Sequence, residues 1–496
     1  MIAQVAFSDL AGLGRSLQNA ELEKTGFSTP IFYTSRLFLG ARREHFMKHL
    51  RLGAVVIEMK CSSMLSRAGF VISLAVCLFA TLRLASAQAP GFEVHAQATY
   101  LRQFKPSFEA PYTGPKSLLP QREYGYSFTG TIFIGARLGN GWEAYFNPEF
   151  VQGSALSELQ GLGGFTNGEN QRTAKGEIQG YSARAFVRKT WNLGGEKDEE
   201  KSDANQVRTR YAGRRVVLTA GNYSVLDVFD AVEYSHDPRT QFLNWSSLTY
   251  GAWDYPADAR GYTWGLGLSY ISEEWSLRAG RYLMPVESNG ITLNRDIAHH
   301  YGEAIELERP YLLAGHKSLL RLLAFRNRVN AGAFRDALAS TTPPDVTQVR
   351  HVQSKNGFGV GTQVAFTEQI GGYVRAGWND GKTETYAFTE IERSLAVGML
   401  MNGTRWQRAE DTVGLSVYVN GLSSAHRDYL AAGGQGFFLG DGRLNYATER
   451  IVETFYSINV VRGLWVTADW QHIANPGYNL DRGPANTYNL RIHFEL

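Results

Sequence analysis

The sequence predicts an all-β protein, a closed antiparallel transmembrane β-barrel of about 16 strands with short turns at one end and long loops at the other. Three observations lead to this fold class. Segments of roughly eight to ten residues alternate between apolar and polar side chains. Glycine and aromatic residues are abundant (52 Gly, 25 Tyr, 27 Phe and 10 Trp), which favours strands, turns and membrane interfaces over helices. A segment typical of an export signal precedes the alternating region.

The alternating segments predict membrane-spanning strands. In the last ten residues, 487–496, every even-numbered side chain is apolar and every odd-numbered side chain is polar. A similar alternation predicts strands at 126–134, 262–270, 413–420 and 464–471. Because successive side chains of a strand point to opposite faces, each segment has one apolar and one more polar face. Their length is close to the roughly 9–11 residues of a tilted strand that crosses a bilayer.

Closure of the sheet and an aqueous interior follow from these strands. Hydrocarbon offers no partner to an unpaired backbone group, so an open sheet edge is excluded and the sheet must close. At about 16 strands the side chains no longer fill the interior, and a water-filled channel is expected. A soluble sandwich or propeller would also alternate, but its strands are shorter, roughly five to six residues, and its turns follow one another more regularly.

The connections divide into two groups. Residues 138–141 and 271–274 are predicted to be short periplasmic turns between alternating runs. Longer segments rich in glycine, asparagine, proline or charge are predicted to be external loops: 152–177, 192–206, 336–354 and 421–447.

The N-terminal region is predicted to be removed. Residues 59–87 have a basic start, an apolar middle and small residues that predict a signal peptide cleaved after Ala87. A membrane-anchoring helix is the alternative, although the apolar run is short for a span. Residues 1–58 are predicted to be an upstream mis-start, the alternative being a genuine or disordered extension. Residues 88–496 then form the barrel domain.

Charge and cysteine content exclude several classes of function. The net charge is +3, so the whole chain has no strong attraction for nucleic acid. Residues 1–87 contain 10 of the 50 basic and 5 of the 47 acidic residues, so the remaining 40 and 42 give a nearly neutral chain. Cys61 and Cys77 both lie in the removed part, and residues 88–496 contain no metal-binding or cofactor motif. No cofactor, metal or nucleic-acid partner is therefore predicted.

Residues from about 240 to 496 resemble the OprB-type carbohydrate-selective porins of Gram-negative outer membranes. The resembling stretches are Ala252–Thr263, Ala425–Leu430, Gly440–Leu444, Trp470–Asn479 and Asp481–Pro484. The resemblance implies a single-chain barrel in the outer membrane that is surrounded by lipid. It also implies passive diffusion of small sugars such as glucose, and a monomer or a loose homo-oligomer. The chain ends in Leu496, whereas outer-membrane barrels usually end in an aromatic residue.

Candidate solute-binding residues lie on the predicted polar faces near the C-terminus. A channel for sugars needs hydrogen-bonding side chains and aromatic rings for stacking, and its binding must stay weak enough for release. These requirements favour Arg491, Glu495, Asp469 and Gln471, with Trp465 as a stacking surface. The alternative is that these residues are wall residues paired with one another.

A second set of candidates lies in the predicted loops. It comprises Asp254, Asp258, Arg260, His426, Arg427 and Asp428, for which the alternative role is a turn-fixing ion pair. The segment 229–237 is a further candidate for a loop that folds into the pore. No catalytic residue is predicted, because no nucleophile and base are suggested by spacing.

The leading functional prediction is a passive, carbohydrate-selective channel. An export channel for an acidic polysaccharide is an alternative, although it would need a strongly basic lumen and the chain without its first 87 residues is nearly neutral. An outer-membrane barrel enzyme is an alternative from a different class.

Overall fold

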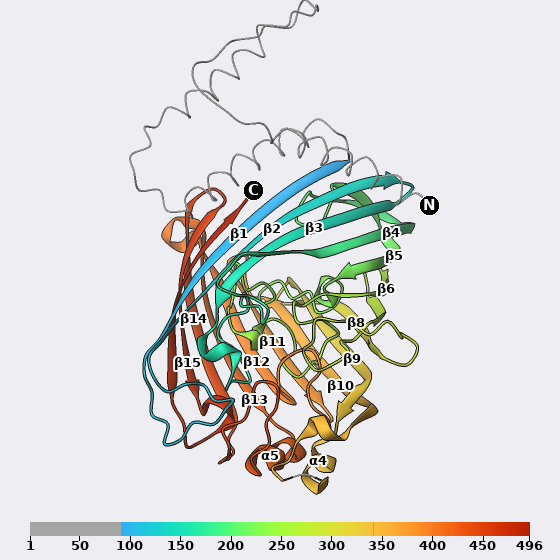
Figure 1. Ribbon diagram of the computed structural model, residues 1–496. Coiled ribbons are helices and arrows are strands. Elements are labelled where there is room, and N and C mark those ends of the chain that lie inside the picture. Colours follow the sequence, from blue (N-terminus) through green and yellow to red (C-terminus); the bar gives the residue numbers. More distant parts are fainter. Residues whose placement is uncertain (1–90, 341) are drawn as a thin grey trace, which may run out of the picture. The chain divides into compact units, whose positions relative to one another are not determined.

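The computed structural model describes residues 91–340 and 342–496, and in this part of the chain sixteen antiparallel strands close into a barrel. Each strand pairs with the next one along the chain, and β1 pairs with β16 to close the ring (Figure 1). The fold class predicted from the alternation is confirmed. The predicted segments 1–58 and 59–87 lie outside the described residues.

The strands vary in length from 7 to 22 residues. Their bounds are β1 (Phe92–Lys105), β2 (Glu123–Gly139), β3 (Trp142–Ser154), β4 (Gln179–Glu200), β5 (Thr209–Tyr223), β6 (Thr263–Ile271), β7 (Ser276–Tyr282), β8 (Tyr301–Leu313), β9 (His316–Gly332), β10 (Arg350–Ala365), β11 (Ile370–Asn379), β12 (Arg393–Gly403), β13 (Arg408–Gly421), β14 (Glu449–Val461), β15 (Leu464–Ala474) and β16 (Ala485–Glu495). The five segments predicted from alternation overlap β2, β6, β13, β15 and β16, to within one residue at Tyr262 and Leu496.

Short helices occur only between strands in the described part of the chain. They are α4 (Phe334–Ser340) and α5 (Ser424–Ala431), with the 3₁₀ segments η1 (Leu156–Leu159), η2 (Val225–Asp227), η3 (Trp245–Ser247), η4 (Val346–Val349), η5 (Thr404–Trp406) and η6 (Pro476–Tyr478). None of the described helices has the length and apolar character that a membrane-spanning helix requires.

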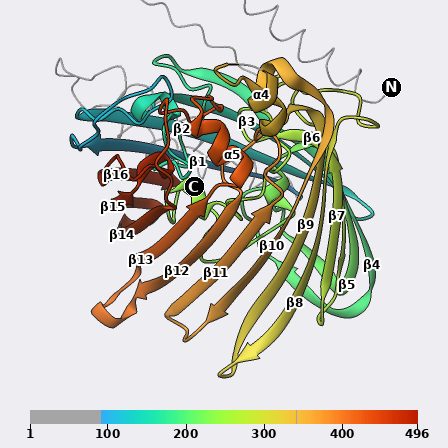
Figure 2. The same cartoon turned by 90° about the horizontal axis from the view of Figure 1, so that it is seen from below.

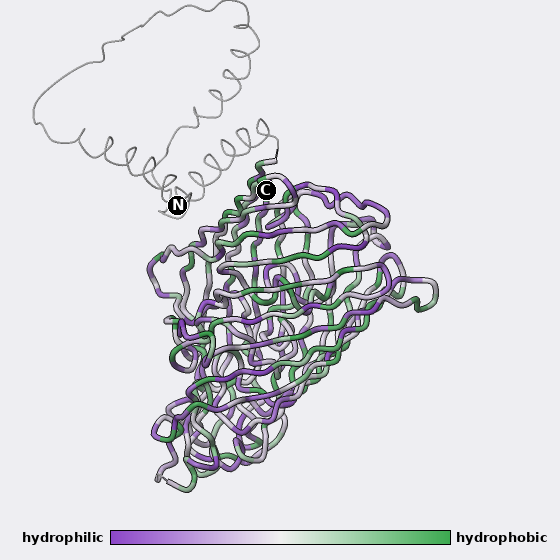
Figure 3. Tube along the Cα trace, turned by 90° about the vertical axis from the view of Figure 1, so that its right-hand side faces the viewer, coloured by the Kyte–Doolittle hydropathy of each residue, from purple (hydrophilic) through white to green (hydrophobic). Residues whose placement is uncertain are grey.

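The two faces of the strands differ as the alternation predicts. On β16 the side chains of Tyr488, Leu490 and Ile492 point outward and are 39–50% exposed. The intervening Asn489 and Arg491 point inward and are at most 5% exposed. Figure 3 shows this pattern as alternating hydrophobic and hydrophilic stretches along the strands. The barrel thus presents an apolar surface to its surroundings and a polar surface to its interior.

The connections at the two ends of the barrel differ in length. At one end, here called the turn end, the strands are joined by short segments such as 140–141, 272–275 and 462–463. At the loop end the connections are mostly long, for example 155–178, and 422–448, which includes α5. Figure 1 shows α4 and α5 at the loop end, opposite the C-terminus, and Figure 2 views the barrel from below, with both helices labelled.

One predicted loop is wrong. Residues 192–206 were expected to be an external loop, but β4 continues to Glu200 and residues 201–208 join it to β5 at the turn end. Register shifts at Gly194 interrupt the pairing there without ending the strand. The charged run 196–201 misleads the prediction because a strand that extends beyond the apolar belt tolerates exposed charges. The predicted loops 152–177, 336–354 and 421–447 overlap connections at the loop end, and 138–141 and 271–274 are turns as expected.

Candidate functional site

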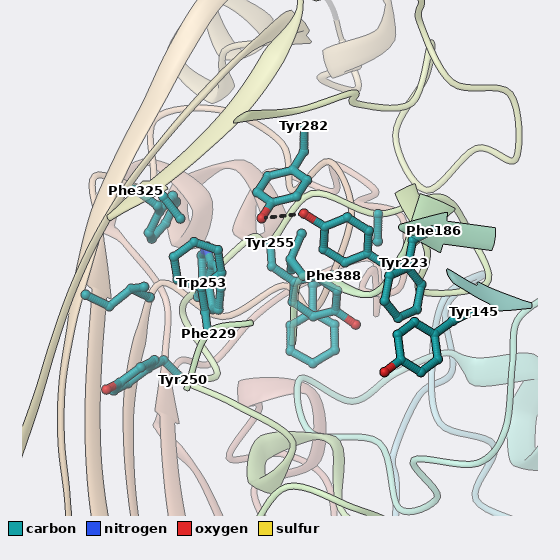
Figure 4. Close-up of a cluster of buried hydrophobic side chains, with 14 of the residues drawn as sticks. Tyr145, Phe186, Tyr223, Phe229, Tyr250, Trp253, Tyr255, Tyr282, Phe325 and Phe388 are labelled. Atoms are coloured by element: carbon teal, nitrogen blue, oxygen red, sulfur yellow. Dashed lines mark hydrogen bonds between the residues drawn. The ribbon is translucent and has the colours of Figure 1, made fainter. Parts of the chain in front are cut away.

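The longest connection, residues 224–262, lies inside the barrel and is here called the inner loop. Its Phe229, Tyr250 and Trp253 are almost completely buried and belong to an aromatic cluster with residues of the inner wall. Figure 4 shows this cluster, in which the hydroxyl groups of Tyr223 and Tyr282 are hydrogen-bonded at 3.2 Å. The expectation that residues 229–237 fold into the pore agrees with this placement. The inner loop therefore narrows the interior that sixteen strands enclose.

A buried carboxylate on β3 holds one side of the inner loop. Glu149 accepts hydrogen bonds from Thr131 Oγ1 at 2.6 Å, from the hydroxyl of Tyr262 at 3.1 Å and from the hydroxyl of Tyr181. It also accepts one from Arg239 Nη2 at 3.0 Å, an arginine of the inner loop. Through charge-assisted bonds, Glu149 thus joins β3 to β2, to β4 and to the inner loop. Tyr262 was expected to begin a strand on its apolar face, but it lies inside the barrel one residue before β6.

Arg239 also connects the inner loop to the neighbouring connection, residues 155–178. Its Nε donates to Glu169 at 3.0 Å, so the guanidinium bridges two carboxylates. Burial would lower the pKa of Arg239, but Glu169 and Glu149 raise it well above its ordinary value. The arginine is therefore charged at all relevant pH values, and its charge is balanced locally.

Ion pairs also hold the opposite side of the inner loop. Asp230 pairs with Arg375 of β11 at 3.0 Å, and both side chains are almost completely buried. The backbone nitrogen of Asp230 donates to Glu306 of β8 at 2.8 Å. Arg321 of β9 pairs with Glu308 at 2.7 Å and donates to the carbonyl of residue 231 at 2.8 Å. The inner loop is thus attached to the wall on several sides.

Arg491 and Gln471, predicted to line the lumen, lie on the inner wall and bind loops there. Arg491 Nη1 donates to the carbonyl oxygens of Pro238 and Gln241, each at 2.7 Å. Gln471 donates to the carbonyl of Thr166 at 2.9 Å and accepts from the side chain of Asn244 at 3.0 Å. Both residues therefore position the loops that narrow the channel, and direct contact with solute stays a prediction.

Asp469 and Asp254 are buried in hydrogen-bond networks. Asp469 accepts from Asn489 at 2.5 Å and from Gln471 at 3.2 Å. Asp254 of the inner loop pairs with Lys355 of β10 at 3.2 Å. Its carboxylate also accepts from the backbone nitrogens of residues 386 and 387. Asp254 therefore joins the inner loop to β10 and to the connection 380–392, and its contact with a solute stays a prediction.

Asp258 and Arg260 shape the end of the inner loop. The Asp258 carboxylate accepts from the backbone nitrogens of Arg260 at 2.8 Å and Tyr262 at 3.2 Å, as in a side-chain-stabilised turn. Burial raises the pKa of Asp258. The guanidinium of Arg260 lies 4.5 Å from the ring centroid of Tyr181, beside the Glu149 network.

Arg427 and Asp428 lie apart from this interior network, on α5. Arg427 stacks on the ring of Tyr446 at 4.6 Å. Asp428 pairs with Arg335 of α4 at 2.8 Å, and both side chains are more than half exposed. Apart from His426, which lies on the same helix, the structure does not bring these two residues together with the other candidates.

His426, also on α5, is completely buried between two carboxylates. Its Nδ1 lies 3.0 Å from Glu392 and its Nε2 lies 3.7 Å from Glu390, both in the connection 380–392. The ring stacks on Phe334 of α4 with centroids 4.2 Å apart. Burial would lower the pKa of His426, but the two carboxylates hold it above its ordinary value. This group ties three connections together at the loop end.

Trp465 and Glu495 line a cavity of about 790 Å³ at the turn end. His95, Asp203 and Arg462 are among the other residues of its wall. Among the candidates predicted from the polar faces of the strands, Trp465 and Glu495 line this cavity, and Arg491, Asp469 and Gln471 do not. At the loop end, a cavity of about 490 Å³ is lined by residues of three connections, among them Arg172, Glu287 and Asn289. Open space therefore exists at both ends of the interior.

The sequence analysis missed Glu149 and Arg239, the charged pair that holds one side of the inner loop. Glu149 lies on the inward face of β3, and the alternation of residues 142–147 contained the signal that would place it there. Arg239 lies in an aperiodic segment, which gave no such signal, and Asp230 was included only as part of the candidate segment 229–237. In the described residues, no group of three or more His, Cys, Asp or Glu side chains is arranged to hold a metal ion.

A closed sixteen-stranded barrel with an apolar outside, a polar inside and an inward-folded loop defines the class of outer-membrane porins. The chain belongs to the OprB family of carbohydrate-selective porins, whose family model matches residues 120–496. It is a sugar diffusion channel of the Gram-negative outer membrane. In this class the short turns face the periplasm and the long loops face the exterior.

Several solved structures are similar to this chain, and the first one described here supports the fold. The high-pH structure of Pseudomonas putida OprB superposes with a TM-score of 0.60 at 14% identity, covering 84% of this chain and 96% of that chain. The low-pH structure of the same protein gives a TM-score of 0.44 at 11% identity, with coverage of 84% and 95%. The outer membrane channel DcaP of Acinetobacter baumannii gives 0.45 at 8% identity, with coverage of 82% and 97%. A comparison with curated protein sequences found no match.

Proposed function

We propose that the channel conducts small neutral sugars as a monomer or loose homo-oligomer, catalyses no reaction, and selects its solutes where the inner loop meets the wall. The observation that carries this proposal is the pairing of charges around the inner loop. Arg239 is matched by Glu149 and Glu169, and Arg375 is matched by Asp230.

Paired charges favour a neutral solute over an ion. Because each of these guanidiniums has a carboxylate partner, the passage has little net charge to attract an ion of either sign. Beside the pairs, the Tyr181 hydroxyl and the Gln171 amide nitrogen are bonded to each other and to Glu149, while Gln171 Oε1 has no partner and can accept a hydrogen bond. A sugar can exchange bonds to water for bonds to these groups, whereas an acidic polysaccharide would need an excess of basic side chains.

The turn-end cavity suits a solute that is leaving the passage. Trp465 offers an aromatic surface to the less polar face of a sugar ring, and Glu495 and Asp203 can accept hydrogen bonds from its hydroxyl groups. The cavity is open, so binding there remains weak, as transport requires.

Planar-bilayer recording of the chain purified from outer membranes tests this proposal. We expect glucose to reduce the ion current in a concentration-dependent manner, and organic anions of similar size to have a weaker effect. Block by the anions without block by glucose would contradict it. Mass measurement of the purified channel in detergent tests the proposed oligomeric state, because a stable, stoichiometric oligomer would exclude a monomer or loose assembly.

A further inference from the structure

The outer surface of the barrel has a basic area at the loop end of β7–β10. Arg281, Arg326 and Arg328 point outward there, together with Ser354 and Asn356 of β10, and these five residues are here called the arginine patch. The strand register places them side by side, because Arg326 is paired with Asn356 and Arg328 with Ser354. Across β8, Glu303 is paired with both Arg281 and Arg326.

The arginine patch begins where the apolar belt of the barrel ends. Two residues further toward the turn end, the outward positions are occupied by Ile305 and Phe358, which are about half exposed, and then by Leu322 and Val360. Two residues of a strand span about 7 Å. An arginine on the lipid face is costly at the bilayer centre and nearly free of cost at the interface, so the patch lies at the level of the lipid headgroups.

Two of the three guanidiniums have unused donors. Arg281 is neutralised by Glu303 at 2.6 Å and lies over the ring of Tyr301. Arg326 contacts only the hydroxyl of Ser354, at 3.3 and 3.4 Å, and Arg328 donates only to the carbonyl of residue 299 at 3.2 Å. Within residues 91–340 and 342–496, neither of these two arginines forms an ion pair. Asp380 lies beside the patch, where its carboxylate accepts a hydrogen bond from the backbone nitrogen of Asn356 at 3.1 Å. With Glu303 and Asp380 set against three arginines, the patch keeps a net positive charge and unused N–H groups.

We infer that the arginine patch binds the phosphate groups of a lipid headgroup in the outer leaflet. The planar fork of arginine matches the geometry of phosphate, and two such forks two residues apart can hold one headgroup from two sides. The apolar surface directly below the patch would contact the acyl chains of the same lipid. This continuity favours a lipid over a free anion, and the loop end places the site on the outer face of the membrane.

Binding of diphosphoryl lipid A to the detergent-solubilised full chain tests the inference, with native mass spectrometry as the readout. We expect retained lipid for the wild-type channel, and weaker binding of its dephosphorylated form. The double variant Arg326→Gln with Arg328→Gln should bind at least about tenfold more weakly, because each change removes charge-assisted hydrogen bonds. The matched control is Arg405→Gln, an exposed arginine at the turn end, which should bind as the wild type does.

Several outcomes would overturn the inference. Unchanged binding by the double variant, equal binding of the dephosphorylated lipid, or displacement of the lipid by millimolar inorganic phosphate would each exclude a lipid-phosphate site. The heat-dependent mobility of the barrel in gels reports whether each variant is folded, and the single variants replace the double variant if it is not. Glucose block of the same preparations is expected to be unchanged, so this result is independent of the transport proposal.

Discussion

Arg491 on the last strand of the barrel donates a 2.7 Å hydrogen bond to the carbonyl oxygen of Pro238, which lies in the inner loop. The same Nη1 atom also reaches the carbonyl of Gln241. A single buried guanidinium thus fixes part of the segment that narrows the channel.

Replacement of Arg491 by alanine should release this part of the inner loop. We expect a larger and noisier single-channel conductance, because two carbonyl groups lose their donor. The free energy of unfolding should fall by about 2–4 kcal/mol, the range for losing charge-assisted bonds and leaving buried acceptors unpaired. Bilayer recording and thermal unfolding in detergent measure the two effects. An unaltered conductance would show that Arg491 does not control the width of the passage.

Replacement of Glu149 by glutamine should change the ion selectivity. Arg239 would keep Glu169 as a partner but lose its other carboxylate, so the passage gains positive charge. We expect the reversal potential in a salt gradient to shift toward anion preference. Glu158→Gln is the matched control, since this exposed glutamate lies in the connection 155–178 outside the network. Equal reversal potentials for the two variants would contradict the assignment of the selective region.

Replacement of Trp465 by alanine should weaken sugar binding in the turn-end cavity. Loss of one aromatic surface is expected to raise the sugar concentration needed for half-maximal block by about three- to tenfold. The effect should be stronger when sugar is added at the turn end of an oriented channel. Trp470→Ala serves as the control, because Trp470 belongs to the same strand but points to the opposite face. If the sugar concentration for half-maximal block is the same in both variants, Trp465 does not contact the solute.

The pair of His426 with Glu392 should make stability depend on pH. Because the pKa of His426 is raised, its contribution is complete below its ordinary value of 6.5 and is lost as the pH rises through the raised pKa. Burial would raise the pKa of Glu392, but His426 lowers it, so the contribution of Glu392 is present above its ordinary value of 4.5 and is lost on further acidification. Burial raises the pKa of Glu390, so the contribution of Glu390 to stability is lost as the pH rises, like that of His426.

His426→Gln should therefore lower the free energy of unfolding by about 3 kcal/mol at pH 6, as expected for breaking a buried ion pair, and by less at pH 9. Thermal unfolding across this pH range measures the difference. Lys355 of β10 lowers the pKa of His426, and because it also pairs with the buried Asp254 it is left unchanged in this test. A loss that is the same at both pH values would exclude the titration of His426 as its cause.

The strands were predictable because each one faces lipid on one side and the barrel interior on the other. The alternation in residues 487–496 predicts β16 to within two residues, since every side chain there faces either lipid or the interior. The same argument predicts that Arg491 points inward. Its contact with Pro238 was not predictable, because about 250 residues separate the two and the inner loop has no periodic pattern.

Errors in the prediction arose where a strand leaves the membrane. The charged residues 196–201 obey no lipid-facing constraint, so their pattern does not distinguish a strand from a loop. The candidate site was predictable only where it lies on strands, as for Trp465 and Glu495. The Glu149–Arg239 pair joins a wall residue to a loop residue, and only the folded arrangement brings these two together.

The seam between β1 and β16 has a consequence for biogenesis. Eight paired positions, from Gln97 with Glu495 to Phe104 with Tyr488, join the start of the barrel to its last eleven residues. A nascent chain stopped before residue 485 would have two unsatisfied edges and no means of sealing them in hydrocarbon. Removal of β16 should therefore abolish the pore altogether instead of yielding a slightly smaller one, and the open sheet would be left to proteolysis.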